Sequence, residues 1–148
     1  MLILLTPEQV SSNWDFISAY VVDAGPLEYQ ATEDKYNNIL NGILCGDMQC
    51  WVEAEADSKG WHIQAVVLTQ ILENSVVGIK NLLIYSLVGV DDLFDNKKWA
   101  SGLLTLVKFA KSKGCANIIG YTSNARLLKI AERLKADTSQ RVAVFPIK

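Results

Sequence analysis

The chain is poor in the residues that usually hold metal ions or disulfide bridges. It contains one histidine, His62, and three cysteines, none of them at a CxxC spacing. Metal sites need several such ligands at recurring spacings, so we expect no metal and a surface or packing role for His62. The odd number of cysteines and their apolar surroundings favour reduced, buried thiols in an intracellular protein. These thiols are Cys45, Cys50 and Cys115.

Long hydrophobic runs and linker-like segments are also missing. The longest apolar stretches, such as 82–90, fall well short of the roughly 18 residues that a membrane span requires. No basic segment precedes the first apolar residues, so no secretory signal is expected. No repeat or Pro/Gly/Ser-rich segment divides the chain. We therefore expect one domain over residues 1–148, located in the cytoplasm, or in the host cytoplasm if the protein is viral, without a membrane partner.

Positive charge is scarce in the first two thirds of the chain. Residues 1–96 hold 3 Lys and 14 acidic residues, a balance of −11, whereas residues 97–148 hold 11 Lys plus Arg and 2 acidic residues, a balance of +9. An anionic ligand is therefore expected to meet the carboxy-terminal third. Nucleic acid is a disfavoured partner, because the basic third lacks a recognition motif and interleaved aromatic residues.

Helical signals dominate the first 44 residues. A short strand at 2–5 leads to Thr6 and Gln9, which have the spacing of a capping box. Apolar residues then recur at helical spacing until Gly25, where Gly-Pro ends the helix. A second amphipathic helix is expected from Thr32 to about residue 44.

The middle of the chain changes to the period of strands. Segments 50–56 and 61–72 are rich in residues that suit a pleated surface, and residues 57–60 between them are typical of a turn. We interpret them as a hairpin. Segment 80–90 is almost entirely apolar, as expected of a central strand that is covered on both faces.

The last third alternates helices and strands. We expect a helix at 99–113, a strand at 116–123, a helix at 124–136 and a last strand at 141–147. Crossover helices return the chain parallel to a strand, so 116–123 should lie beside 80–90. The predicted fold class is α/β, a mixed, mostly antiparallel sheet flanked by about four helices.

This order of elements resembles the GNAT family of N-acetyltransferases over nearly the whole chain. In that family the fourth strand leads into a turn of form R/Q-x-x-G-x-G/A, whose backbone amides hold the coenzyme A pyrophosphate at a helix amino terminus. Here the segment from Lys97 to Gly102, KKWASG, lies in register with it, and Gly102 is expected in the first helical turn. The bland alternative is an ordinary strand-to-helix connection without a ligand. The cofactor-binding residues that the resemblance implies are Val88, Gly89, Val90, Lys97, Lys98, Ala100, Ser101, Gly102 and Asn124.

A second family pattern, N-x6-Y-E-K-x-G-F, follows the fifth strand. In this sequence Asn124 and Glu132 agree with it in spacing, and the asparagine is the residue that faces the cofactor in the family. The tyrosine that often protonates the leaving thiolate is replaced by Ala131, and residues 80–90 contain no carboxylate base. The catalytic residues therefore stay unassigned. Candidates for proton transfer near a thioester are Tyr85, Ser86 and Tyr121.

Four other side chains on the predicted hairpin each have two possible roles. Trp51 and Trp61 either belong to the core or line an acceptor cleft. Glu53 and Glu55 share one strand face with Trp51 and either face solvent or attract an amine.

The function that the resemblance implies is transfer of an acetyl group from acetyl-CoA, or a related acyl-CoA, to an unidentified amine. Amides around Val88 to Val90 would hold the thioester, and the amine would attack it directly, without a covalent nucleophile on the protein. The alternative is a non-catalytic structural or interaction protein with a GNAT-like fold. Compact divergent members of that kind occur in phages, other viruses and mobile elements. Either protein is compatible with oligomerisation.

Overall fold

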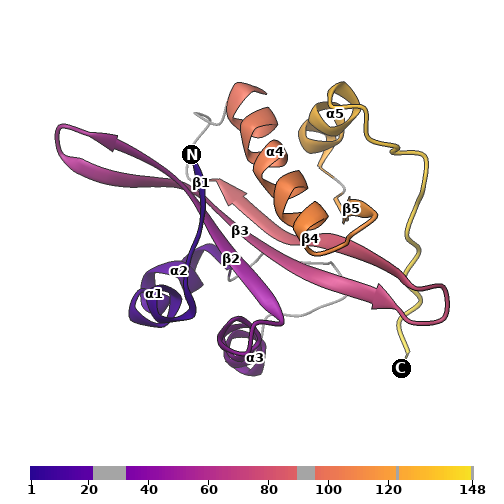
Figure 1. Cartoon of the computed structure of the whole chain (residues 1–148), viewed down its shortest axis with the longest axis horizontal. Helices are drawn as coiled ribbons and strands as arrows, with labels where there is room; N and C mark the ends of the chain where they lie inside the picture. Colours follow the sequence, from indigo (N-terminus) through magenta and orange to yellow (C-terminus); the bar gives the residue numbers. More distant parts are fainter. Residues whose placement is uncertain (22–32, 90–95, 123, 148) are drawn as a thin grey trace.

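A five-stranded mixed sheet organises the computed structural model of the protein (Figure 1). The structure describes residues 1–21, 33–89, 96–122 and 124–147. The strands are β1 (Leu2–Leu4), β2 (Met48–Asp57), β3 (Gly60–Asn74), β4 (Ile79–Gly89) and β5 (Asn117–Gly120), and they lie in chain order across the sheet. Strands β1 to β4 pair antiparallel, whereas β5 lies parallel to β4. The predicted fold class and the expected pairing of β4 with β5 are confirmed.

The helices that the structure describes cover both faces of this sheet. They are α1 (Pro7–Ser12), α2 (Trp14–Val21), α3 (Glu33–Leu44), α4 (Asn96–Ser112) and α5 (Ala125–Arg133). Figure 1 shows α1, α2 and α3 on one face, and α4 and α5 on the other. None of these helices is long and apolar enough to cross a membrane.

The first predicted helix is two helices. Thr6 and Gln9 form the expected capping box, with the Thr6 hydroxyl accepting from the Gln9 amide. The helix then breaks at Asn13, whose side chain donates to the Gln9 carbonyl at 2.8 Å. Asparagine and serine side chains compete for backbone hydrogen bonds, so the Ser11-Ser12-Asn13 run is a weak point in a helix. The chain beyond Val21, which includes the expected stop at Gly25, lies outside the described residues.

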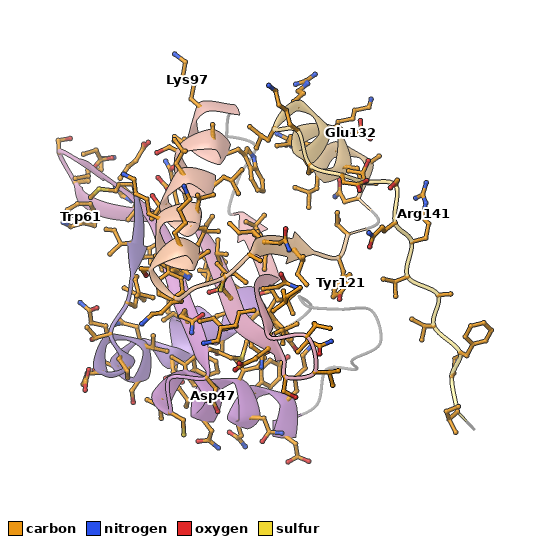
Figure 2. The ribbon with its side chains drawn as sticks, turned by 45° about the vertical axis from the view of Figure 1, so that its right-hand side comes forward. Asp47, Trp61, Lys97, Tyr121, Glu132 and Arg141 are labelled. Carbon is orange, nitrogen blue, oxygen red and sulfur yellow. The ribbon has the colours of Figure 1, made fainter. Side chains whose placement is uncertain are left out.

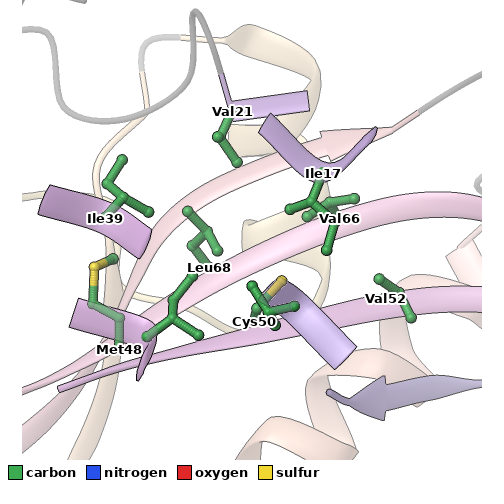
Figure 3. Packing of buried hydrophobic residues seen from close by; sticks show 10 residues of the cluster. Ile17, Val21, Ile39, Met48, Cys50, Val52, Val66 and Leu68 are labelled. Atoms are coloured by element: carbon green, nitrogen blue, oxygen red, sulfur yellow. The ribbon is translucent and has the colours of Figure 1, made fainter. Parts of the chain in front are cut away.

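Two apolar clusters hold the helices to the sheet. One lies under α1, α2 and α3 and contains Leu68, which is completely buried at the centre of β3 (Figure 3). The other lies under α4 and contains Trp51 and Leu82. β4 thus contributes to both faces, with Tyr85 packed against the first cluster and Leu82 in the second, as predicted for a central strand.

The three cysteines differ in environment. Cys50 is buried in the first cluster, and burial raises the pKa of its thiol to about 12, so it stays protonated near neutral pH. Cys45 is exposed and Cys115 is half-buried. The expectation that all three are buried is therefore wrong for Cys45, which follows α3 in the turn before β2 rather than a core segment.

Residues 141–147 do not form the predicted strand. They have an extended course without regular secondary structure (Figure 1). Their apolar alternation suits a strand, but a strand is defined by backbone pairing with a neighbour, and no described strand pairs with this segment. The alternating apolar residues therefore indicated a sequence able to form a strand, but not a neighbouring strand with which it could pair.

Candidate functional site

The site is built around the point where β4 and β5 separate. β5 pairs with β4 only from Asn81 to Ile84, while β4 continues along β3 as far as the pair Ala65 and Gly89. Within the described ranges no strand pairs with the β5-facing edge of residues 85–89. In the described part of the chain this carboxyl end of β4 is therefore a strand edge, whose backbone groups need a partner other than a strand.

A β-bulge at Tyr85 alters the direction of β4 at this point. Leu68 pairs with Ser86 and Thr69 pairs with Ile84, which leaves Tyr85 as the extra residue. Tyr85 packs against the cluster under α1 to α3, whereas Ile84 faces the cluster under α4. Bulges of this kind bend a strand, raise its twist and often lie beside active sites.

Ser86 follows the bulge and is buried, with 5% of its surface exposed. Its Oγ has no hydrogen-bond partner among the described atoms. A buried hydroxyl without a partner costs about 1–3 kcal/mol, so such groups are rare in folded proteins and call for an explanation. Of the three candidates for proton transfer, Ser86 is the one whose environment is unusual. Tyr121 follows β5 and is half exposed.

The amino terminus of α4 supplies amide donors next to this end of the sheet. Helix geometry leaves the amides of the first turn, residues 96–99, without partners inside the helix. Lys97 is exposed and projects from this end of α4 (Figure 2). Lys98 points to the hairpin instead, where its Nζ lies 2.8 Å from Glu55 Oε1 and 2.7 Å from Gln64 Oε1. The hydrogen bond and charge of Lys98 hold the pKa of Glu55 below its ordinary value.

The expected position of Gly102 in the first helical turn is wrong. Gly102 lies in the second turn of α4, is buried, and faces the Leu2 side chain of β1. A Cβ atom at Gly102 would lie 3.9 Å from Leu2 Cδ2. The amides of Ala100, Ser101 and Gly102 fall beyond the first turn, where helix geometry directs them to carbonyls of the same helix. This distance is an ordinary van der Waals contact, so Gly102 lies at the packing of α4 on β1 rather than at a ligand.

The other residues predicted to contact the cofactor do not all lie at one place in the structure. Val88 and Gly89 lie at the end of β4, where the edge is open, and Val90 lies outside the described residues. Asn124 is the N-cap of α5, and its Oδ1 accepts from the amides of Arg126 at 2.9 Å and Leu127 at 3.3 Å. Its side-chain oxygen is therefore used locally, although α5 begins at the carboxyl end of β5. Figure 1 shows α4 and α5 side by side above the sheet.

Half-buried Ala131 of α5 occupies the position of the tyrosine in the family pattern. Trp51 is a core residue: its Nε1 donates to Thr69 Oγ1 at 3.0 Å, and its ring meets Phe109 edge-on with centroids 5.1 Å apart. Trp61 is exposed near the turn of the β2–β3 hairpin. The two tryptophans therefore do not line one surface.

The remaining polar candidates are engaged in contacts with other groups of the protein. His62 Nε2 lies 2.9 Å from Asp57 Oδ2 at the exposed end of the hairpin, which confirms a surface role. The buried carboxylate of Glu53 contacts the Met1 ammonium. Across the described residues no group of three or more His, Cys, Asp or Glu side chains is arranged to hold a metal ion.

Many solved structures have this arrangement of strands and helices. A probable acetyltransferase covers 100% of this chain and 98% of its own with a TM-score of 0.72 at 9% identity. An aminoglycoside N-acetyltransferase in complex with a CoA bisubstrate analogue covers 100% and 97%, with a TM-score of 0.72 at 12% identity. A predicted acetyltransferase from Clostridium acetobutylicum with acetyl-CoA covers 98% and 95%, with a TM-score of 0.69 at 12% identity. No protein-family model and no curated protein matches the sequence.

Proposed function

From the premise that this chain has the fold of the GNAT N-acetyltransferases, we propose that it binds an acyl-CoA and transfers the acyl group to an amine. Acetyl-CoA is the cosubstrate that the similar structures suggest, because two of them hold CoA groups or acetyl-CoA. The amine nitrogen attacks the thioester carbonyl, the carbon–sulfur bond breaks, and coenzyme A leaves as the thiol once it has taken up a proton.

The separation of β4 from β5 is the observation that carries this proposal. The strand edge at residues 86–89 would offer amides and carbonyls to an extended pantetheine arm and its thioester. The first turn of α4 offers amides and the charge of Lys97 to a pyrophosphate, since a helix amino terminus favours anions. Val88, Gly89, Lys97 and the first-turn amides, that of Lys98 included, are the contacts we propose. For Asn124 we propose a contact through the start of α5.

Calorimetric titration with acetyl-CoA tests the proposal. We expect heat of binding and a rise in melting temperature, since a ligand at 100 times its Kd stabilises the folded state by about 2.7 kcal/mol. Pantetheine, which lacks the phosphates, is the matched control and should bind far more weakly. If millimolar coenzyme A gives neither heat nor a thermal shift, the non-catalytic structural or interaction role takes the place of this proposal.

The acceptor is an amine that the sequence does not identify. Similar structures include acetyltransferases for aminoglycosides, for ribosomal-protein alanine and for glucosamine-6-phosphate. These compounds form a rational panel for an assay of free thiol release from acetyl-CoA. Turnover is expected to be slow with common small amines, because Ala131 cannot protonate the leaving thiolate and general-acid assistance typically contributes 10² to 10⁴ in rate.

Ser86→Ala is expected to lower the rate of acyl transfer without lowering the stability of the protein. We propose that the Ser86 hydroxyl donates to the bound acyl group or acceptor, so its removal should lower the acyl-transfer rate by about 3- to 10-fold, the value of one hydrogen bond. The free energy of unfolding should stay the same or rise, because the folded protein no longer buries an unpaired hydroxyl. Thiol release and urea denaturation measure the two effects.

Ser101→Ala on the exposed side of α4 is the control for Ser86→Ala, and it should change neither quantity. A loss of stability in Ser86→Ala would mean that the hydroxyl is bonded in the folded protein, and it would remove Ser86 from the site.

A further inference from the structure

The β2–β3 hairpin carries an exposed tryptophan near its turn. In the described part of the chain β1 pairs with β2 only as far as Glu53, and β4 pairs with β3 only as far as Ala65, so residues 54–64 continue as a two-stranded ribbon. Figures 1 and 2 show this ribbon standing out from the body of the protein, with Trp61 near its end. Trp61 is 69% exposed, and within the described ranges it makes no hydrogen bond, ion pair or ring contact. Tryptophans presented on ordered strands often dominate the energy of binding to another protein.

The polar side chains of the ribbon share one of its two faces. Glu55 accepts from Gln64 Nε2 at 2.9 Å and pairs with Lys98 of α4. Two residues farther along the same face, a carboxylate oxygen of Asp57 lies 2.9 Å from His62 Nε2. These contacts order the ribbon and link it to the beginning of α4.

Trp61 lies on the other face of the ribbon, the one that carries α1, α2 and α3. Side chains alternate along a strand, so Trp61 shares a face with Ile63, which packs against the cluster under these helices. Leu68 belongs to the same cluster and pairs with Ser86, whose buried hydroxyl has no partner among the described atoms. Cross-strand partners project to the same side of a sheet. The side chains of Trp61 and Ser86 therefore belong to one face, and α4 with the proposed pyrophosphate site belongs to the other.

The side of the sheet that carries α1, α2 and α3 has an excess of negative charge. Its exposed charged residues include Glu8, Asp15, Asp34 and Asp47, whereas Lys35 is half-buried. Charge of one sign on one side of a protein attracts a partner of the opposite sign and speeds its association. Lysine and arginine side chains also bind the face of a tryptophan ring by cation–π contact. Charge and aromatic surface both favour a cationic partner.

We propose that this face of the ribbon, centred on Trp61, docks a polypeptide rich in lysine or arginine, and that this polypeptide is the amine acceptor. The inference rests on the proposed acyl transfer. The cationic side chains of the polypeptide contact Trp61, and its amine reaches the acyl group beside Ser86. Coenzyme A arrives from the side of α4, so the anionic and the cationic substrate approach opposite faces of the sheet.

The separation between Trp61 and Ser86 sets the length of the acceptor. Ser86 pairs with Leu68, and Leu68 follows Trp61 by seven positions on β3. A strand rises about 3.3 Å per residue, so the two points lie about 23 Å apart. An extended peptide spans this distance with about seven residues. The docked cations should therefore follow the acetylated amine by about seven residues.

Fluorescence anisotropy of a labelled peptide tests the docking step. The probe is a peptide of about twelve residues with a free amino terminus, three arginines that begin about seven residues along it, and a label at its carboxyl end. We expect Trp61→Ala to raise the dissociation constant about 10-fold and Trp61→Phe to restore most of the affinity. A peptide with glutamine in place of arginine should bind far more weakly. Leu104→Ala removes an exposed apolar side chain from α4 on the other face and should leave the affinity unchanged.

Acetyl transfer to the same peptide tests its role as acceptor. We expect Trp61→Ala to raise the KM for the peptide about 10-fold and to leave kcat unchanged, because the ring takes part in binding and lies far from the reacting atoms. The rate with ethylamine, which is too short to reach Trp61, should be unchanged in the variant. A peptide whose arginines directly follow its amino terminus should have the higher KM with the native chain. Circular dichroism checks that each variant is folded.

The docking surface and the proposed function can fail separately. Equal affinity of the peptide for the native chain and Trp61→Ala, or equal affinity of the native chain for the arginine and glutamine peptides, overturns the inference. Self-association of the chain that Trp61→Ala abolishes also overturns it, since Trp61 would then contact a second copy. Acetylation of ethylamine without acetylation of the bound peptide shows that the polypeptide is not the acceptor. If coenzyme A gives no heat and no amine is acetylated, the proposed function fails, and binding of the arginine peptide that depends on Trp61 still supports the docking surface.

Discussion

Lys97→Glu is expected to weaken coenzyme A binding by about 10- to 100-fold. Lys97 is exposed at the amino terminus of α4, where the proposed site receives the pyrophosphate. A charge pair about 4 Å apart in water contributes about 1 kcal/mol, so reversal replaces that attraction by an equal repulsion. Each 1.4 kcal/mol changes the dissociation constant tenfold. Calorimetric titration of coenzyme A into both proteins measures the change.

Lys111→Glu is the matched control for Lys97→Glu. It makes the same change in net charge on the same helix, but Lys111 lies in the last turn of α4, more than a Debye length from the proposed site at physiological salt. Coenzyme A affinity should change little. The effect of Lys97→Glu should also shrink as salt rises. Equal effects of the two substitutions would show that coenzyme A responds to overall charge, and the proposed pyrophosphate position would be wrong.

Leu68→Ala is expected to lower the free energy of unfolding by about 2–5 kcal/mol. Leu68 is completely buried at the centre of β3, in the cluster that joins α1, α2 and α3 to the sheet. Truncation removes its buried surface and leaves a cavity that a packed core closes only in part. Because Leu68 pairs with Ser86 beside the bulge, the same change should also weaken coenzyme A binding. Urea denaturation measures the stability.

The control for Leu68→Ala is Leu72→Ala on the same strand. Leu72 is 36% exposed, so the alanine leaves no enclosed cavity and the loss should be clearly smaller than for Leu68. Similar losses at the two positions would contradict the division of β3 into a buried centre and an exposed end.

Much of the fold could be predicted because local patterns coincide with the final environment. The segment 80–90 is apolar on both faces, and β4 is covered on both faces. The capping box at Thr6 formed because all of its partners lie within four residues. The break at Asn13 was not predicted, since helical apolar spacing continues through it while the backbone is interrupted by a side-chain bond.

The candidate site was less predictable, because its features depend on register between distant residues. The sequence correctly placed Lys97 near the start of the helix that follows β4. It placed Gly102 in the first turn of that helix, as a ligand-binding residue, whereas Gly102 lies in the second turn and packs against Leu2. The bulge at Tyr85 and the unpaired hydroxyl of Ser86 arise from pairing with Leu68 and Thr69, which no local pattern encodes. Segment 141–147 shows the same limit. Its alternating apolar residues are typical of a strand, but they do not indicate which strand it would pair with.

The contact between Lys98, Glu55 and Gln64 has a consequence for the energetics of ligand binding. It links the beginning of α4 to the β2–β3 hairpin through side chains of the protein itself. A helix end that is already ordered loses little conformational entropy when an anion arrives, so more of the interaction energy appears as affinity. The two adjacent lysines thus have different roles in the proposed site. Lys98 orders the helix end when the protein folds, and Lys97 contacts the ligand.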